Sequence, residues 1–172
     1  MCIIIHKPKG KKLDEEKFRF AWESNDDGAG WCFVRGGKLI IRKGVHDVDD
    51  AWKGIKKDIK ENGNPQMLIH LRYTTRGATD DENCHPFPIR GHGVAMMHNG
   101  TIHKIGVPAN STTGRSDSRI FAEDMLPNFK RGFESDEMHL DMIQAYISAE
   151  SRVVFMSTKD KVTFVNKTLL SH

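Results

Sequence analysis

The second residue of the chain is a cysteine, and its position can give it two reactive groups at once. Methionine aminopeptidases remove Met1 when the next residue is small, which leaves Cys2 with a thiol and a free α-amine. An α-amine has a reference pKa of about 7.7 to 8.0 and a thiol one of about 8.5, so the amine can accept the thiol proton near neutral pH, directly or through water. A cysteine considered alone more often fills space in a core. The assignment of Cys2 as a nucleophile therefore depends on the rest of the chain.

Four further motifs follow Cys2 along the chain: NDDGAG at 25–30, HLRYTTRGA at 70–78, HNGTI at 98–102 and SDS at 116–118. In this order, and over residues 2–125, they resemble the class II glutamine amidotransferases, which are N-terminal-nucleophile (Ntn) hydrolases. The resemblance implies that Cys2 hydrolyses the side-chain amide of glutamine and releases ammonia, with no cofactor and no metal. It also implies a four-layer α/β/β/α sandwich, in which two mainly antiparallel sheets are flanked by helices.

The resemblance assigns a role in binding or catalysis to four residues besides Cys2. Arg72 matches the arginine that binds the substrate carboxylate, for which a guanidinium can form two parallel charge-assisted hydrogen bonds. Asp117 matches the aspartate that pairs with the substrate ammonium, although an Asp at the start of a helix can also be an N-cap. Asn99 and Gly100 match the pair that forms the oxyanion hole, through a side-chain NH2 and a backbone N–H. An isolated Asn-Gly pair would instead indicate a hairpin turn.

A second group of residues is expected to shape the site. The small residues of the DGAG loop are expected to let the backbone approach Cys2 closely. Thr75 and Gly77 match the part of the family motif that lines the glutamine pocket, and His85 opens an H-P motif found on the following loop. The expected structural shell consists of Asp27, Gly28, Gly30 and His85.

The sequence departs from the family pattern at several positions. Tyr73 and Thr74 replace Trp-Ala, Arg76 replaces a histidine, and Arg119 stands where an acid is expected. The chain also ends soon after the glutaminase-like region. The resemblance therefore implies glutamine as substrate and a separate ammonia-accepting synthetase as partner.

Three other interpretations remain open. A zinc protein is possible because imidazole and thiolate bind zinc, but the spacing of the candidate ligands matches no standard motif. These candidates are Cys84, His85, His92, His98 and His103. An Ntn acylase would act on another amide, which the pairing of Arg72 with Asp117 argues against. A catalytically inactive binding or regulatory module would result if Met1 were retained, because the α-nitrogen of Cys2 would then be an amide.

The hydrophobic patterns predict an α+β domain in which a mixed, largely antiparallel sheet has helices outside it. Gly36-Gly37 separates two apolar runs as the turn of a hairpin, and Asp14 is placed to begin a helix. Residues 74–93 are rich in Gly, Pro, Asp and Asn and are expected to form an irregular connection that carries site residues. The predicted strands lie at 2–5, 31–35, 38–42, 66–73, 93–98, 153–157 and 162–166, and the predicted helices at 13–22, 49–61, 116–125 and 135–148.

Composition limits the class of protein. With 172 residues, the chain is expected to form one domain over residues 1–172. A net charge of +3, with basic residues interspersed among acids, gives no support for nucleic-acid binding. No apolar run approaches the roughly 20 residues of a membrane span. The N-terminal segment lacks the pattern of a secretory signal, so a cytoplasmic location with reduced thiols is expected.

Overall fold

Two antiparallel sheets, each of four strands, form the centre of the computed structural model, which describes residues 2–166. The first sheet has the order β1-β4-β2-β3 and the second the order β5-β6-β7-β8. The strands of the first sheet are β1 (Ile3–Lys7), β2 (Ala29–Arg35), β3 (Lys38–Val45) and β4 (Met67–Leu71). Those of the second are β5 (Phe87–Ile89), β6 (Val94–Asn99), β7 (Arg152–Ser157) and β8 (Val162–Val165).

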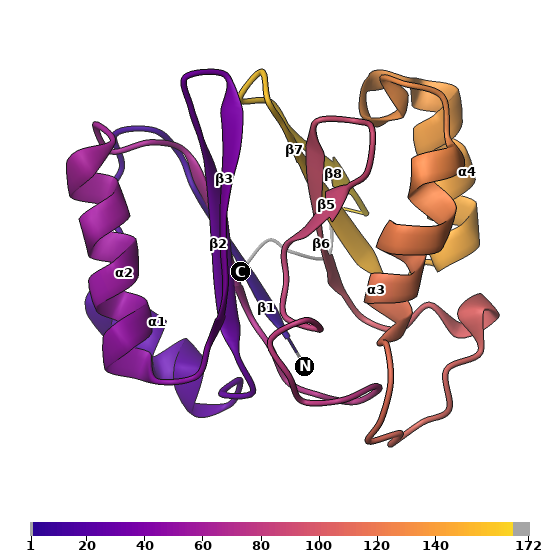
Figure 1. Ribbon diagram of the computed structural model, residues 1–172, viewed down its shortest axis with the longest axis horizontal. Coiled ribbons are helices and arrows are strands. Elements are labelled where there is room, and N and C mark those ends of the chain that lie inside the picture. Colours follow the sequence, from indigo (N-terminus) through magenta and orange to yellow (C-terminus); the bar gives the residue numbers. More distant parts are fainter. Residues whose placement is uncertain (1, 167–172) are drawn as a thin grey trace.

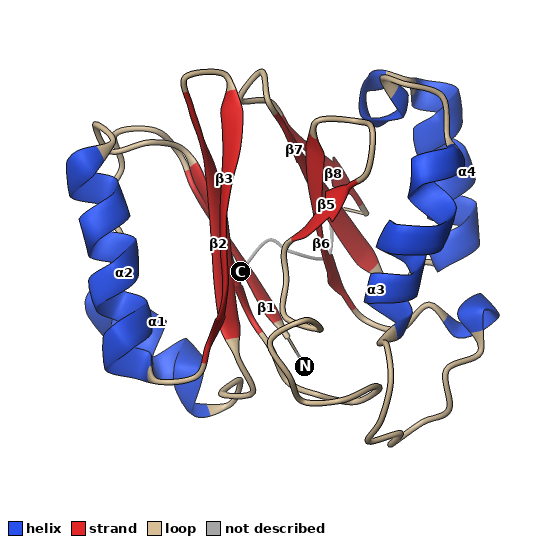
Figure 2. Cartoon of the chain, in the orientation of Figure 1, coloured by secondary structure: helices blue, strands red, loops and turns tan. Residues whose placement is uncertain are grey.

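The helices lie on the two outer faces of the sheet pair (Figure 1). Helices α1 (Glu15–Glu23) and α2 (Val48–Glu61) cover the first sheet. Helices α3 (Asp117–Ile120) and α4 (Glu137–Ile147) cover the second, and α3 continues as a π-helical turn over Phe121–Met125. Short 3-10 turns cover His103–Ile105, Leu126–Asn128 and Phe133–Ser135. Figure 2 shows the resulting α/β/β/α layers, which confirm the predicted fold class.

Alternation along the strands divides the core into three layers, because successive side chains of a strand point to opposite faces. In β2, Trp31 and Phe33 pack toward α1 and α2, whereas Cys32 packs between the sheets. In β6, Met96 packs toward α3 and α4, whereas Met97 packs between the sheets. Each sheet is therefore apolar on both faces, as a four-layer arrangement requires.

Most predicted elements are confirmed within a few residues. Asp14 is the N-cap of α1, and its side chain accepts a hydrogen bond from the Lys17 backbone. Gly36 and Gly37 both have positive φ angles at the β2–β3 turn. The prediction that residues 74–93 are wholly irregular is wrong, because β5 lies within them. Pro88 in its centre argues against a strand, but β5 is an edge strand, where proline is tolerated.

The described part of the chain, residues 2–166, contains no helix that is both long and apolar enough to cross a membrane.

Candidate active site

Cys2 lies immediately before β1, at the end of β1 that pairs with the last residue of β4. The antiparallel register pairs Ile3 with Leu71, so Cys2 comes next to the residues that follow β4. The backbone N–H of Tyr73 donates to the Cys2 sulfur at 3.2 Å, and the thiol lies 3.4 Å from the Tyr73 carbonyl oxygen. A chain segment about seventy positions away in sequence therefore holds the thiol in place.

Strand alternation explains why three of the predicted site residues meet. Ile4 packs between the sheets, and so do Leu68 on β4 and Met97 on β6. Every second residue of a strand faces the same side, so the side chains of Cys2, Arg72 and Asn99 also face the space between the sheets. The site thus forms where the space between the two sheets ends.

The Cys2 thiol is a weak acid in this setting. Burial raises its pKa, and the carboxylate of Asp117 acts in the same direction. The hydrogen bond with the Tyr73 backbone and the positive charge of Arg72 lower the pKa. Because the raising effects prevail, the thiol is protonated at neutral pH, and a nucleophilic role would require a base.

Asn99, the last residue of β6, reaches from the second sheet to Cys2, which precedes the first strand of the first sheet. Its side-chain Nδ2 donates to the Cys2 carbonyl oxygen at 2.9 Å, and only 4% of the residue is exposed. Gly100 follows with φ +109°, and a Cβ there would lie 2.9 Å from the Glu150 carbonyl oxygen. The structure thus places Asn99 next to Cys2, and the backbone at Gly100, the other predicted oxyanion-hole residue, strongly favours glycine.

Arg72 and Asp117 are opposite charges buried near the thiol. The Arg72 guanidinium donates to the carbonyl oxygens of Ala78 at 2.9 Å and Arg76 at 3.3 Å. Asp117 accepts from the Ile102 backbone N–H at 2.7 Å. Within residues 2–166, neither charge has an ion-pair partner, although their residues are only 3% and 5% exposed. Buried charges normally have partners, so this pair is well suited to a zwitterionic ligand.

The alternative role of Asp117 as an N-cap is not what the structure shows. Ser116 is the N-cap of α3, and its side chain accepts from the Arg119 backbone N–H at 3.2 Å. Asp117 is the first helical residue. Its carboxylate is therefore free of the capping role.

The expected shell residues lie close to the site but make different contacts from those expected. The Asp27 carboxylate accepts from the Thr74 backbone N–H at 2.7 Å, which fixes the start of the loop after β4. A Cβ on Gly28 would lie 2.4 Å from the Cys84 sulfur, and one on Gly30 would lie 1.8 Å from the His85 carbonyl oxygen. The tight approach of these glycines is therefore to the segment 84–85 and not to Cys2, because β1 and β2 are separated in the sheet by β4.

Thr75 and Gly77 lie on the loop that follows Arg72. The Thr75 carbonyl oxygen accepts from the Asn110 backbone N–H at 3.0 Å, and the Gly77 N–H donates to the Ser111 hydroxyl at 2.8 Å. The Thr75 residue is exposed. The loop is thus joined to residues 110–111 beside it. Arg76, which replaces the family histidine, adds hydrogen bonds to the Val107 carbonyl oxygen and the Thr101 hydroxyl.

Three histidines form a buried group that we call the histidine cluster: His70, His85 and His98. The rings of His70 and His85 stack with centroids 3.8 Å apart. Burial lowers the pKa of His70 to about 3 and that of His98 to about 4, and it lowers that of His85 well below its ordinary value. The cluster is therefore neutral at pH 7.

The tautomer of His98 follows from its hydrogen bonds. The Ser151 hydroxyl donates to the Thr101 carbonyl oxygen at 2.9 Å, so it accepts from His98 Nε2 at 3.1 Å. His98 Nδ1 then accepts from the Ser118 hydroxyl at 2.7 Å. Both ring nitrogens are engaged, so His98 supports the structure beneath Asn99. Ser118 and Ser151 lacked a sequence signal for this role, because their proximity arises only from the packing of α3 and β7 on β6.

The proposed zinc ligands do not form a ligand set. In residues 2–166, no three or more His, Cys, Asp or Glu side chains are grouped so that they could hold a metal. The Cys84 thiol donates to the Asp80 carbonyl oxygen, His92 donates to the Pro127 carbonyl oxygen, and His98 is held by two serines. The zinc interpretation therefore has no site in the described residues.

Comparisons with known proteins agree with this geometry. No family model matches the sequence. Among curated proteins, the chain is similar to glutamine–fructose-6-phosphate aminotransferase [isomerizing] of Sulfurisphaera tokodaii, with 22% identity over 148 residues, or 82% of this chain and 25% of that protein. The enzyme of the same name from Corynebacterium diphtheriae is 30% identical over 79 residues, which are 44% of this chain and 12% of that protein. The chain thus spans a quarter or less of the length of these relatives.

Among solved structures, the fold matches glutamine phosphoribosylpyrophosphate (PRPP) amidotransferase from B. subtilis with a TM-score of 0.53 and 17% identity. The match covers 92% of this chain and 35% of that one. Another structure, described as the allosteric regulatory enzyme of purine biosynthesis, has a TM-score of 0.52 at the same identity. At this identity the structural likeness establishes the fold, which is that of the Ntn hydrolases. Together with the curated relatives, it makes the chain similar to class II glutamine amidotransferases over most of its length.

Proposed function

We propose that this domain hydrolyses the side-chain amide of glutamine through Cys2 and supplies ammonia to an acceptor on a separate protein. Cys2, Asn99 and Gly100 act as the catalytic residues, and Arg72, Asp117, Thr75 and Gly77 bind the substrate. We also propose that residues 1–172 form one such domain and that it works in the cytoplasm.

Substrate binding follows from the two buried charges. Arg72 offers its remaining N–H groups to the α-carboxylate, and Asp117 accepts hydrogen bonds from the α-ammonium. With both charges of the α-carbon held, the side-chain amide extends toward the Cys2 thiol. This arrangement favours a free amino acid over an acylated substrate, which lacks the ammonium.

The reaction requires a base, and Cys2 supplies its own once Met1 is removed. The α-amine accepts the thiol proton while the sulfur attacks the amide carbon. Negative charge develops on the amide oxygen, where the Asn99 Nδ2 and the Gly100 N–H donate. The tetrahedral intermediate expels ammonia, which takes the proton from the α-ammonium, and leaves a glutamyl thioester. Water then attacks the thioester, releasing glutamate and restoring the thiol.

One observation carries the proposal: the Asn99 amide lies 2.9 Å from the Cys2 carbonyl oxygen, and the buried charges of Arg72 and Asp117, which have no ion-pair partner within residues 2–166, both act on the pKa of the Cys2 thiol. Incubating the purified chain with L-glutamine should yield glutamate and ammonia in equal amounts, and Cys2→Ala should yield neither. Turnover of simple acyl amides without glutamate formation would instead support an acylase.

Removal of Met1 is a separate requirement, and Met1 lies outside the described residues. Intact-mass measurement of the purified protein should show a chain that is one Met shorter than the translated sequence. A mature chain that retains Met1 and does not release glutamate would support the inactive binding module.

A further inference from the structure

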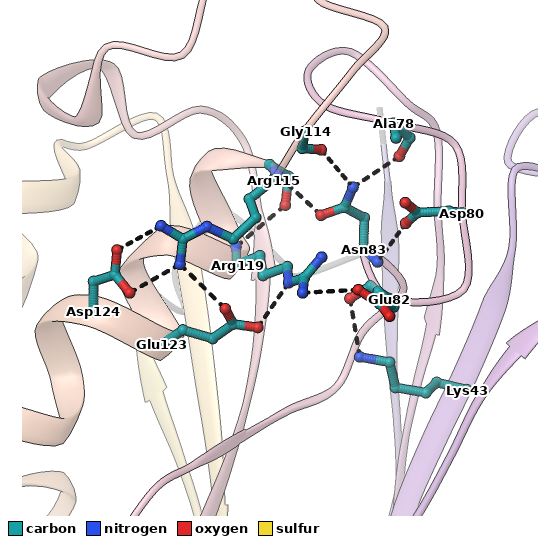
Figure 3. Close-up of polar contacts among 11 residues, drawn as sticks. Lys43, Ala78, Asp80, Glu82, Asn83, Gly114, Arg115, Arg119, Glu123 and Asp124 are labelled. Atoms are coloured by element: carbon teal, nitrogen blue, oxygen red, sulfur yellow. Dashed lines mark hydrogen bonds and ion pairs between the residues drawn. The ribbon is translucent and has the colours of Figure 1, made fainter.

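Asn83 is a fully buried residue in the loop between β4 and β5, and all its side-chain hydrogen-bonding atoms have partners. Its Nδ2 donates to the carbonyl oxygens of Ala78 at 3.0 Å and Gly114 at 2.9 Å. Its Oδ1 accepts from the Ser116 backbone N–H at 3.0 Å. Figure 3 shows the Asn83 side chain between these two stretches of backbone.

The partners of Asn83 are next to the two charges that we assign to substrate binding. The Ala78 carbonyl oxygen also accepts from Arg72 Nη1 at 2.9 Å. Ser116 is the N-cap of α3 and directly precedes Asp117. A single amide side chain therefore contacts an acceptor of Arg72 on one side and the neighbour of Asp117 on the other.

The two charges come from different layers of the fold. Arg72 follows β4 of the first sheet, whereas Asp117 begins a helix that covers the second sheet. Sheet pairing alone does not fix their separation, yet both must reach groups on the same carbon atom of glutamine. A change in the separation of the two charges would prevent one of them from reaching its group on the substrate and so weaken binding, which makes a rigid connection between them important.

We infer that Asn83 is a positioning residue that sets the separation of Arg72 and Asp117 and thereby the selectivity for a free α-amino acid. This inference rests on the proposed function. It specifies what holds the substrate-binding charges in register, and it assigns a role to a residue to which the sequence reasoning gave none.

Other contacts between the two segments support the connection. The Ala78 N–H donates to the Gly114 carbonyl oxygen at 2.9 Å. A Cβ on Gly77 would lie 2.7 Å from the Ser116 backbone nitrogen, so the segments are in close contact there. An Arg119–Glu82 ion pair at 2.9 Å also joins them (Figure 3), but the Glu82 side chain is 74% exposed. Exposed ion pairs contribute little, whereas loss of Asn83 leaves the buried Ser116 N–H unpaired.

The test compares Asn83→Asp and Asn83→Ala with the wild-type chain. The Asp variant keeps the acceptor for Ser116 but turns a second oxygen toward the carbonyl oxygens of Ala78 and Gly114. For both variants we expect KM for glutamine to rise at least about tenfold while kcat changes less than about threefold. Asn62→Ala is the matched control, because Asn62 donates to the Asp58 carbonyl oxygen at the far end of α2, and its KM should equal that of the wild type.

Two reagents separate positioning from general disruption. Iodoacetamide has neither an α-carboxylate nor an α-ammonium and does not bind to either charge, and the Asn83 variants keep both Arg72 and Asp117, so its rate should stay within about twofold of the wild type. A diazoketone analogue of glutamine carries the α-amino and α-carboxylate groups, and its inactivation rate should fall in parallel with the rise in KM. Equal losses with both reagents, or an unchanged KM in a folded variant, would overturn the role of Asn83.

The wild-type chain supplies a test that does not depend on the folding of a variant. Hydrogen exchange at the Ala78 and Ser116 amides should slow together when the inactivator or glutamate occupies the site, and independent changes would contradict the coupling. If the wild type neither hydrolyses glutamine nor reacts with the diazoketone, the proposed function fails as well. Normal wild-type turnover with unaltered Asn83 variants overturns the positioning role alone.

Discussion

Replacing Asn99 with alanine removes a group that acts differently in the free enzyme and in the transition state. In the free enzyme its Nδ2 donates to the Cys2 carbonyl oxygen at 2.9 Å, and its Oδ1 is buried without a hydrogen-bond partner in the described residues. Loss of one neutral hydrogen bond costs about 1 kcal/mol of stability. Loss of one oxyanion donor costs about 2.7 to 4 kcal/mol of transition-state stabilisation, which lowers kcat roughly 100- to 1,000-fold.

Asn99→Ala should therefore remain folded, with an unfolding midpoint only a few degrees lower, while kcat for glutamine falls far more than KM changes. Steady-state glutamate release gives kcat and KM, and thermal unfolding gives the midpoint. Alkylation of Cys2 by iodoacetamide should proceed at the wild-type rate, since that reaction forms no oxyanion. A normal kcat, or a defect confined to KM, would refute the assignment of Asn99 to the oxyanion hole.

The pH dependence of Cys2 alkylation should have its midpoint above that of an ordinary thiol, because burial raises the pKa of Cys2. Arg72→Gln should raise this midpoint, because it removes a positive charge, and Asp117→Asn should lower it, because it removes a negative charge. Shifts of the same sign in both variants would contradict the geometry. The histidine cluster should make the fold sensitive to acid. The pKa values of these histidines in the folded state lie below the unfolded value of about 6.5, so the unfolded chain binds more protons below pH 6.5. The stability that the neutral cluster contributes is therefore fully present above about pH 6.5 and is lost as the pH falls toward 4. Urea unfolding should give a free energy lower by up to about 4 kcal/mol at pH 5.5 than at pH 7.5, and equal values would show that these histidines bind protons as readily in the folded as in the unfolded chain. Gly30→Ala should destabilise the fold by about 1 to 3 kcal/mol, because its Cβ would meet the His85 carbonyl oxygen, and an unchanged urea midpoint would mean that β2 and the loop at His85 can separate there.

The sequence was informative where local chemistry decides structure. The Gly36-Gly37 turn, the Asp14 cap and the apolar runs of β2, β4 and β6 predicted those elements, because each depends on neighbours in sequence. The site residues are predicted from their resemblance to family motifs. Strand alternation then gives a physical reason for their meeting, since Cys2, Arg72 and Asn99 share the inter-sheet side.

The sequence was less informative where contacts join distant segments. Asn83 is one of several polar residues in an irregular stretch, and nothing local distinguishes it from its neighbours until the loop folds against residues 114–116. The close contacts of Gly28 and Gly30 were attributed to the wrong partner for the same reason. Composition indicated a need for close approach, but only the strand order shows that Cys84 and His85 are the groups approached.

The structure also narrows the choice of the base that activates Cys2. His98 has both ring nitrogens in hydrogen bonds with serines, and burial lowers its pKa to about 4, which makes it a poor proton acceptor. His70 donates to the His98 carbonyl oxygen, and its pKa is lowered to about 3. The carboxylate of Asp117 is already bonded to the Ile102 N–H and is needed for the substrate ammonium. Among the described groups that surround the thiol, none is a suitable base near neutral pH, so the proposed chemistry requires the α-amine that removal of Met1 creates. The proposed activity is thus conditional on processing, and a chain with the same folded site but a blocked α-amine should bind glutamine without hydrolysing it.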